Sequence, residues 1–159
     1  MSDSLTSTGT DVPAPVARLA GVMAGYPATW SICGGWAVDA WLGRQTRDHG
    51  DTDLSVFDAD HEALARHLDG WQLIPHNSTV DDATVRQWGG ERLTVPSHLH
   101  ARSPEDAGPL PGTGICLVED GWWLDIQIDG IDGDAWVLRT DPYVAMPMRD
   151  AVRTSPWGV

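Results

Sequence analysis

Lysine is absent from this chain of 159 residues, and arginine supplies all 10 basic side chains against 23 acidic ones. The formal net charge is therefore −13. Such a shortage of positive charge excludes the basic face with which nucleic-acid-binding proteins displace counterions. It also argues against binding to an anionic membrane surface. A cationic small molecule, a metal ion or a metal-bound phosphate fits this charge, although dispersed acidic residues can also serve solubility alone.

Cysteines and long apolar runs are also scarce. Cys33 and Cys116 are the only thiols, and without an export signal they are expected to be free and reduced, with a cytoplasmic location as the default. No stretch approaches the roughly 20 apolar residues that span a bilayer. Residues 1–15 are rich in Ser, Thr, Asp and Pro and are predicted to form a disordered leader rather than a signal peptide. Residues 16–159 are predicted to form one domain.

Tryptophan is abundant where the other aromatic residues are rare, with nine Trp, two Tyr and one Phe. A tryptophan can stack on a ligand ring, but it also buries a large area in a core. Core packing is the expected role of most of the nine. Hydrophobic residues make up 42% of the chain, which is ordinary for a globular domain.

The hydrophobic pattern predicts helices alternating with strands. Helical periodicity and end signals favour helices over residues 16–26, 36–42 and 61–68, with Gly43 ending the second and Asp60 capping the third. Strands are expected over residues 29–33, 53–57, 71–74, 122–128 and 135–139, and weaker ones over 91–95 and 114–118. Prolines favour a loop over residues 97–114, and the end of the chain shows only a weak helical pattern. This order predicts an α/β or α+β fold with a mixed sheet flanked by helices.

Gly34 and Gly35 stand between a predicted strand and a predicted helix. Glycine permits a close backbone approach, and the free N–H groups at the start of a helix attract phosphate. The pair therefore suits a phosphate site, although a glycine pair at this point is more often an ordinary turn.

Asp51 and Asp53 stand at the entrance of the strand predicted over residues 53–57. Side chains two apart on a strand point to the same side, so these carboxylates repel each other unless a divalent cation lies between them. Mg²⁺ takes carboxylate and phosphate oxygens as ligands. A solvated acidic loop is the alternative, because Asp-x-Asp also occurs at Asp58 and Asp132.

Asp125 lies between Leu124 and Ile126 in an otherwise apolar predicted strand. A carboxylate in that position costs free energy unless it is paired or binds a metal ion. If this strand lies beside the Asp53 strand, three carboxylates meet on one face, as metal-assisted nucleotidyl transfer requires. The third can also accept a proton from a hydroxyl group. The alternative is a water-facing residue on an edge strand.

The segment over residues 34–54 resembles the signature of the aminoglycoside 2″-adenylyltransferase family, and is similar to lincosamide nucleotidyltransferases. The resemblance rests on an ungapped block that contains Gly-Gly-Trp-Ala, Leu-Gly-Arg, Thr-Arg and His-x-Asp-x-Asp-Leu. A weaker likeness continues through residues 123–125 and 136–142. The resemblance implies a nucleotidyltransferase-like mixed sheet flanked by helices over the chain from about residue 16 to its end.

The resemblance also implies roles for individual residues. Gly34 and Gly35 would hold the nucleotide phosphates, and Asp51, Asp53 and Asp125 would be the catalytic carboxylates and ligate two Mg²⁺ ions. Arg44 and Arg47 would reach a phosphate of ATP or another nucleoside triphosphate, and pairing with Asp39 or Asp48 is the alternative for these arginines. His49 is expected to order its loop rather than to react.

The implied activity is Mg²⁺-dependent transfer of AMP, or of another nucleoside monophosphate, to a hydroxyl group of a small molecule. A cationic aminoglycoside or a lincosamide antibiotic would serve as the acceptor. Two other classes stay open: a biosynthetic enzyme on the same scaffold that needs neither metal nor nucleotide, and a non-catalytic binding or regulatory module. The resemblance implies a C-terminal helical part beyond residues 156–158 that completes the acceptor cleft. Three alternatives stay open for this chain: a bare catalytic domain, a subunit whose cleft is completed by a homodimer or a partner subunit, and a fold kept for another purpose.

Overall fold

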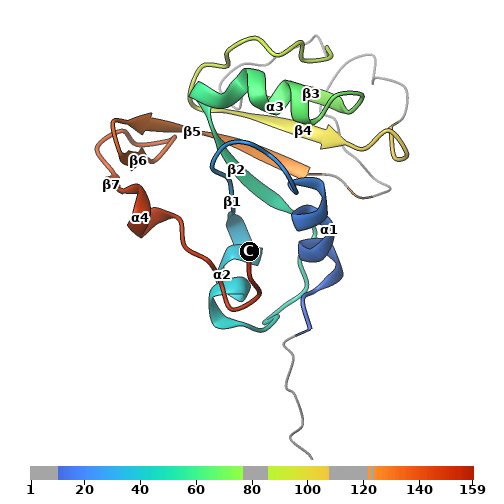
Figure 1. Ribbon diagram of the computed structural model, residues 1–159, viewed down its shortest axis with the longest axis vertical. Coiled ribbons are helices and arrows are strands. Elements are labelled where there is room, and N and C mark those ends of the chain that lie inside the picture. The colour runs from blue at the N-terminus through green and yellow to red at the C-terminus, as the bar shows by residue number, and fades with distance from the viewer. Residues whose placement is uncertain (1–10, 77–85, 108–121, 123) are drawn as a thin grey trace, which may run out of the picture.

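The computed structural model describes residues 11–76, 86–107, 122 and 124–159. Residues 1–10 of the predicted leader, the strand predicted over 114–118 and Cys116 lie outside the described residues. Helices and strands alternate along the first half of the chain, and strands dominate the second (Figure 1). The elements are α1 (Ala14–Val22), β1 (Ser31–Ile32), α2 (Gly34–Leu42), β2 (Asp53–Phe57), the 3₁₀ turn η1 (Asp58–Asp60), α3 (His61–His67), β3 (Gln72–His76), β4 (Ser97–Arg102), β5 (Leu124–Asp132), β6 (Ala135–Val137), β7 (Ala145–Pro147) and α4 (Met148–Ala151).

One mixed sheet organises the molecule, with the main strand order β1-β2-β5-β4-β3. Within the described chain β2 and β5 form the parallel pair, and the other pairs are antiparallel. The far half of β5 extends beyond this sheet and pairs with β6, which in turn pairs with β7. The chain thus has the mixed α/β fold that the sequence predicts.

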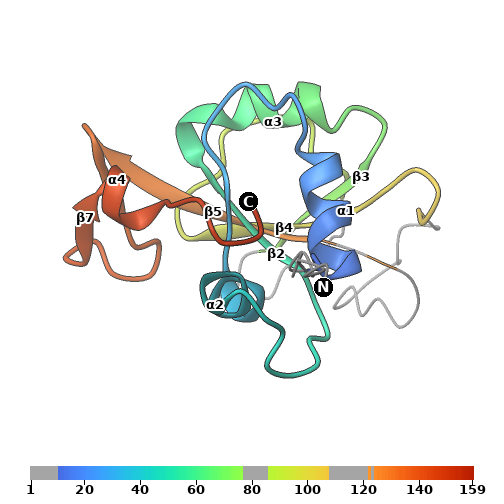
Figure 2. The ribbon, with the colours of Figure 1, turned by 60° about the horizontal axis from the view of Figure 1, so that its bottom comes forward.

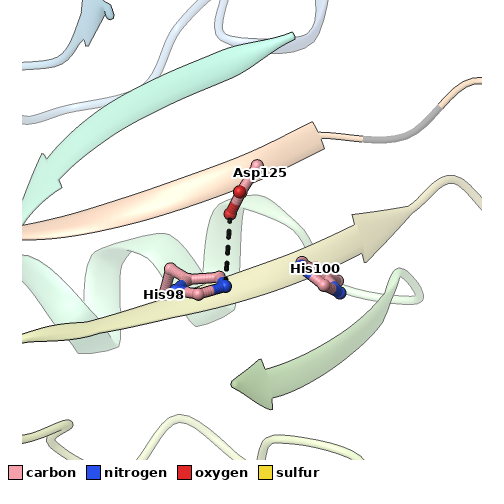
Figure 3. Close-up of side chains that lie close together, drawn as sticks. All are labelled: His98, His100 and Asp125. Atoms are coloured by element: carbon pink, nitrogen blue, oxygen red, sulfur yellow. Dashed lines mark ion pairs between the residues drawn. The ribbon is translucent and has the colours of Figure 1, made fainter. Parts of the chain in front are cut away.

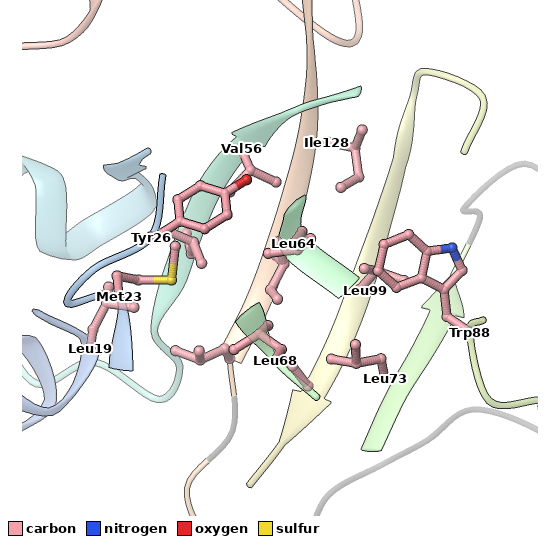
Figure 4. Packing of buried hydrophobic residues seen from close by; sticks show 14 residues of the cluster. Leu19, Met23, Tyr26, Val56, Leu64, Leu68, Leu73, Trp88, Leu99 and Ile128 are labelled. Carbon is pink, nitrogen blue, oxygen red and sulfur yellow. The ribbon is translucent and has the colours of Figure 1, made fainter. Parts of the chain in front are cut away.

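The hydrophobic core lies on one face of the sheet. Residues at alternate positions of β2, β4 and β5, among them Leu54, Leu99 and Ile126, are buried together with Leu19 of α1 and Leu64 of α3. Figure 4 shows side chains from both helices and the strands meeting in this cluster. Most of the intervening strand positions, among them Asp53, His98 and Asp125, carry polar side chains, so the opposite face of the sheet is largely polar.

Helix α2 belongs to a second, smaller cluster at the other end of the molecule. Its Trp36 and Ala40 pack with Val16 of α1 and with Trp157 near the C-terminus. Figure 1 shows α2 and the C-terminus near each other, away from α3, and Figure 2 shows α2 and α3 on opposite sides of the strands. Gly43 takes a left-handed conformation with φ of 66° at the end of this helix, as the sequence predicts for a helix stop.

Several predicted elements are confirmed. Strand β2 has the predicted bounds, α3 begins at the predicted residue, and Leu124, Ile126 and Ile128 of β5 all face the core. Of the eight described tryptophans only Trp41 is exposed, which agrees with the packing role expected for most of them. Cys33 is a free thiol, as expected.

The prediction of a loop over residues 97–114 was wrong at its start, because residues Ser97–Arg102 form the interior strand β4. This segment alternates in burial along its length, with Leu99 and Ala101 in the core and His98 and His100 on the other face. The nearby prolines favoured a loop, but Pro96 and Pro104 flank the strand rather than interrupt it. The strand predicted over residues 91–95 does not form.

The C-terminal region contains more structure than its sequence pattern suggests, because β7 and α4 follow β6. Trp36 and Ala40 of α2 are buried, whereas Trp41 of the same helix is 61% exposed. No helix in the described part of the chain is long and apolar enough to cross a membrane.

Candidate active site

Asp53 and Asp125 are directly opposite each other on the parallel pair β2 and β5. Both side chains lie on the polar face of the sheet, because their neighbours Leu54, Leu124 and Ile126 point into the core. The main chain fixes this arrangement: the Asp125 amide donates to the Thr52 carbonyl at 3.0 Å. The sheet therefore brings together two carboxylates that stand far apart in the sequence.

The alternative for Asp125, a water-facing residue on an edge strand, does not apply. Strand β5 lies between β2 and β4 in the sheet, and the Asp125 side chain is only 16% exposed. Burial and then the charge of Asp53 raise the pKa of Asp125 to about 7, against a smaller opposing effect of Arg139. Burial and the charge of Asp51 also raise the pKa of Asp53. Three carboxylates thus sense one another electrostatically.

Asp51 is exposed and lies two residues before the start of β2. Its carbonyl accepts a hydrogen bond from the indole of Trp36 at 3.0 Å. A small cavity of about 90 Å³ lies beside it, lined by Trp36, His49 and Trp122 among others. The indole thereby fixes the backbone of Asp51 and leaves its carboxylate accessible.

Gly34 lies directly against Asp53. Its φ is +63°, and a Cβ on this residue would overlap the Asp53 carboxylate. Gly34 is also the first residue of α2, and the Cys33 amide before it donates to the Asp53 carbonyl at 3.1 Å. Only glycine fits both the space and the backbone conformation, so the start of α2 approaches the carboxylates closely.

Gly35 makes room for the loop over residues 44–50. A Cβ here would overlap the His49 ring and lie 2.6 Å from the Arg47 guanidinium. Arg47 thus lies beside the start of α2, where it donates to the Asp48 carbonyl at 3.0 Å. Arg44 is exposed, and no described contact brings its side chain to the carboxylates. The structure therefore places Arg47, but not Arg44, next to the glycine pair.

Asp39 holds this loop together. Its buried carboxylate accepts hydrogen bonds from the amide and hydroxyl of Thr46 and lies 2.6 Å from Nε2 of His49. Hydrogen bonding from Thr46, aided by His49, lowers the pKa of Asp39 to about 2 against the effect of its burial. His49 also stacks on Trp36 at 4.2 Å between ring centroids. His49 orders the loop, as its sequence context predicts, and the pairing considered between Asp39 and the arginines is replaced by Thr46 and His49.

Four further residues on this side of the sheet were not predicted as site residues. His98 and His100 of β4 lie on the polar face, and His98 Nε2 is 3.9 Å from Asp125 Oδ1. The Gln127 amide donates to Asp53 Oδ1 at 3.4 Å. The charge of Arg139 lowers the pKa of both Asp53 and Asp125. The alternation of residues 97–102 could have revealed the histidines, whereas no local pattern marks Arg139.

A larger cavity of about 650 Å³ lies elsewhere, between β1, α2 and the C-terminal segment. Trp30, Trp41 and Asp150 line it, and none of the predicted site residues does.

The profile of one protein family, described as aminoglycoside-2″-adenylyltransferase, matches residues 16–104. That segment is more than half of the chain and contains both glycines, Asp51 and Asp53. The chain belongs to this family. Membership supports a nucleotidyltransferase-like role and implies a nucleotide co-substrate and a metal ion. The matched segment ends before Asp125, so the geometry alone connects Asp125 with the family's Asp-x-Asp motif. No curated protein and no solved structure matches the chain.

Proposed function

We propose that the chain is a Mg²⁺-dependent nucleotidyltransferase that moves AMP, or another nucleoside monophosphate, from a nucleoside triphosphate to a small-molecule hydroxyl group. The observation that carries the proposal is the alignment of Asp53 and Asp125 on adjacent parallel strands, with Asp51 in electrostatic range. Family membership supports the reaction class.

The donor set fits a hard divalent cation. Asp51, Asp53 and Asp125 offer carboxylate oxygens, which are the ligands that Mg²⁺ prefers. Asp125 Oδ1 is buried and accepts no hydrogen bond among the described residues. A bound cation would compensate this oxygen for the lost contact with water. When bound, Mg²⁺ would neutralise phosphate charge and polarise the reacting phosphoryl group.

The protein residues would then act in distinct ways. The start of α2 at Gly34 and Gly35, with Arg47 beside it, would bind the phosphates through N–H groups and a guanidinium. Arg44 and Arg139 are further cationic candidates for phosphate contacts. Asp125 would accept the proton of the acceptor hydroxyl. The hydroxyl oxygen bonds to the α-phosphorus, the bond from that phosphorus to the bridging oxygen breaks, and pyrophosphate leaves.

A polycationic acceptor of the aminoglycoside type suits the net charge of −13, and a lincosamide is the second candidate acceptor. The exposed apolar side of α2, with Val38, Trp41 and Leu42, is where a second copy or partner subunit would pack to complete the cleft.

The test is a pyrophosphate-release assay with ATP and the other nucleoside triphosphates against aminoglycosides and lincosamides in Mg²⁺. The D51N/D53N variant is expected to lose at least about 100-fold in rate, because charge stabilisation in the transition state depends on these ligands. The matched control is D132N/D134N, which changes an equally spaced pair of exposed aspartates in the β5–β6 turn. Release that survives D51N/D53N would refute the metal role, and absence of release with every acceptor would favour a binding module.

A further inference from the structure

The two histidines of β4 and Asp125 of β5 lie together on the polar face of the sheet (Figure 3). His98 and His100 are two positions apart on β4, so their side chains leave the strand on the same side. The register places His100 opposite Asp125 and His98 opposite Gln127. Three side chains that can bind a metal ion are thus presented by two rigid neighbouring strands.

The distances fit a shared cation. One nitrogen from each histidine and one carboxylate oxygen of Asp125 all lie within 4.8 Å of one another, and His98 Nε2 is 3.9 Å from Asp125 Oδ1. Ligand atoms around a tetrahedral zinc ion with bonds of about 2.0–2.1 Å lie roughly 3.4 Å apart. A closure of about 1 Å through side-chain torsions therefore completes the geometry.

Unsatisfied buried oxygens are a second observation that favours cation binding on this face. Asp125 Oδ1 and Gln127 Oε1 are buried oxygens that accept no hydrogen bond within the described ranges. An unsatisfied buried acceptor of this kind is unfavourable, because it has lost its hydrogen bonds to water without replacement. Both oxygens belong to the face that carries the histidines, and the Asp125 oxygen is the one that faces His98 (Figure 3). A cation between the two strands would satisfy it.

We propose that His98, His100 and Asp125 bind a divalent transition-metal ion of the zinc class. Imidazole nitrogen is a ligand that Zn²⁺, Co²⁺ and Fe²⁺ prefer and that Mg²⁺ does not seek. Two imidazoles and one carboxylate leave at least one coordination position open for water or for a ligand. This site is distinct in chemistry from the all-carboxylate site at Asp51 and Asp53, and it shares Asp125 with that site.

The shared carboxylate has a consequence that rests on the proposed function. If Asp125 acts in transfer, as a Mg²⁺ ligand or as the proton acceptor, a zinc-class ion that binds it together with His98 and His100 takes it out of that role. Micromolar Zn²⁺ then inhibits transfer, while Mg²⁺ supports it.

Binding of the metal alone tests the proposal. The full chain, freed of metal with a chelator, is titrated with Zn²⁺ by calorimetry and with Co²⁺ by visible absorption, which reports the ligand field. We expect one tight site, a fall of at least about 100-fold in affinity in H98Q/H100Q, and a much smaller fall in D51N/D53N, which keeps all three ligands but removes two nearby negative charges. The H61Q/H67Q variant, which alters two histidines bonded to backbone carbonyls elsewhere, is the matched control.

A measurement on the unaltered chain covers the case in which the double variant does not fold. Zn²⁺ should shift the imidazole ¹⁵N resonances of two of the six histidines, and those two should be His98 and His100. Unshifted imidazoles, or tight binding that is lost in D51N/D53N and kept in H98Q/H100Q, would overturn the proposal. Zinc binding to a chain that releases no pyrophosphate with any acceptor would refute the proposed transferase and support this zinc site. Pyrophosphate release by a chain that binds no zinc would support the transferase and refute the zinc site.

Discussion

At the scale of single residues, Gly34 has the strictest requirement in the candidate site. Its positive φ and the overlap that any Cβ would make with the Asp53 carboxylate are separate constraints, and each by itself disfavours any side chain. Gly21, in the last turn of α1, has neither constraint, and a Cβ there would meet nothing within 4 Å. The two glycines therefore form a matched pair for mutation.

Replacement of Gly34 by alanine is expected to push the Asp53 carboxylate aside. A displacement of about 1 Å at a catalytic group can cost roughly 100-fold in rate, so we expect a loss of that order in pyrophosphate release. The melting temperature should fall by a few degrees, because alanine is strained at this φ. Gly21→Ala should retain full activity and raise the melting temperature slightly, because alanine favours the helix. Equal behaviour of the two variants would contradict the role of Gly34.

Asp39 is a second residue whose role could not be predicted from the sequence. A carboxylate in the middle of a helix, between Val38 and Ala40, could be read as a surface residue or as a partner for nearby arginines. In the structure it is fully buried and bonded to Thr46 and His49, so it positions the loop that leads to Asp51. Its role depends on a loop conformation that residue spacing does not specify.

At the scale of elements, strand β5 is destabilised when no metal is bound and Asp125 is ionised, because that charge is buried next to Asp53. Burial and the charge of Asp53 raise the pKa of Asp125 to about 7, from an ordinary value near 4 in the unfolded chain. Above the unfolded pKa, the folded chain holds a proton that the unfolded chain has released. The stability of the metal-free protein therefore falls as pH rises from about 4 to about 7, and the lost part stays lost at higher pH.

Asp125→Asn should relieve this destabilisation. In chelator at pH 8 the variant is expected to melt roughly 3–8 °C above the parent chain, and the difference should shrink toward zero near pH 4. Mg²⁺ should raise the melting temperature of the parent more than that of the variant. The control is Asp132→Asn, at an exposed position on the same strand, which should shift the curve little at any pH. A difference that does not vary with pH would argue against the raised pKa.

Much of this element pattern could be predicted from the sequence. Strand β2 and the core-facing residues of β5 follow from alternating hydrophobicity, and the end of α2 follows from Gly43. Asp125 could be singled out because a charge inside an apolar run is costly. Its position opposite Asp53 could not be predicted, only assumed in the argument for a shared site. The pairing of distant strands is set by the packing of the whole sheet.

The missed strand β4 shows where sequence reasoning fails. Its alternation is present, but only Leu99 and Ala101 are strongly apolar, and the flanking prolines are typical of loops. The strand exists because β3 and β5 pair with it on both sides. With β4 assigned to a loop, His98 and His100 had no reason to be placed near Asp125. Arg139 was missed for a similar reason, since its proximity follows from the β5–β6 hairpin.

At the scale of the whole molecule, the excess of 13 negative charges acts over distances longer than any contact. Such a field attracts a polycation and repels a free nucleotide, and salt screens both effects within about 10 Å at 0.1 M ionic strength. The charge alone does not identify the acceptor, but it makes acceptor classes distinguishable.

The acceptor class should be visible in salt dependence. If the acceptor is a polycationic aminoglycoside, raising the ionic strength from about 0.02 to about 0.3 M should raise its KM roughly tenfold. A lincosamide, which carries far less charge, serves as the control and should show a change below about twofold. The measurement is the initial rate of pyrophosphate release at saturating ATP and Mg²⁺. Equal salt dependence for both acceptors would remove electrostatic steering as the basis of acceptor choice.

The parallel pairing of β2 with β5 also affects when the candidate site forms during folding. The N-terminal elements can form from nearby segments, but Asp53 meets Asp125 only after the chain has passed through α3, β3 and β4. Closing so long a connection is slow compared with local helix formation, because entropy is lost before the pairing gains anything. The chemistry of this protein is therefore a late product of folding: a chain can hold most of its secondary structure and still lack the third carboxylate.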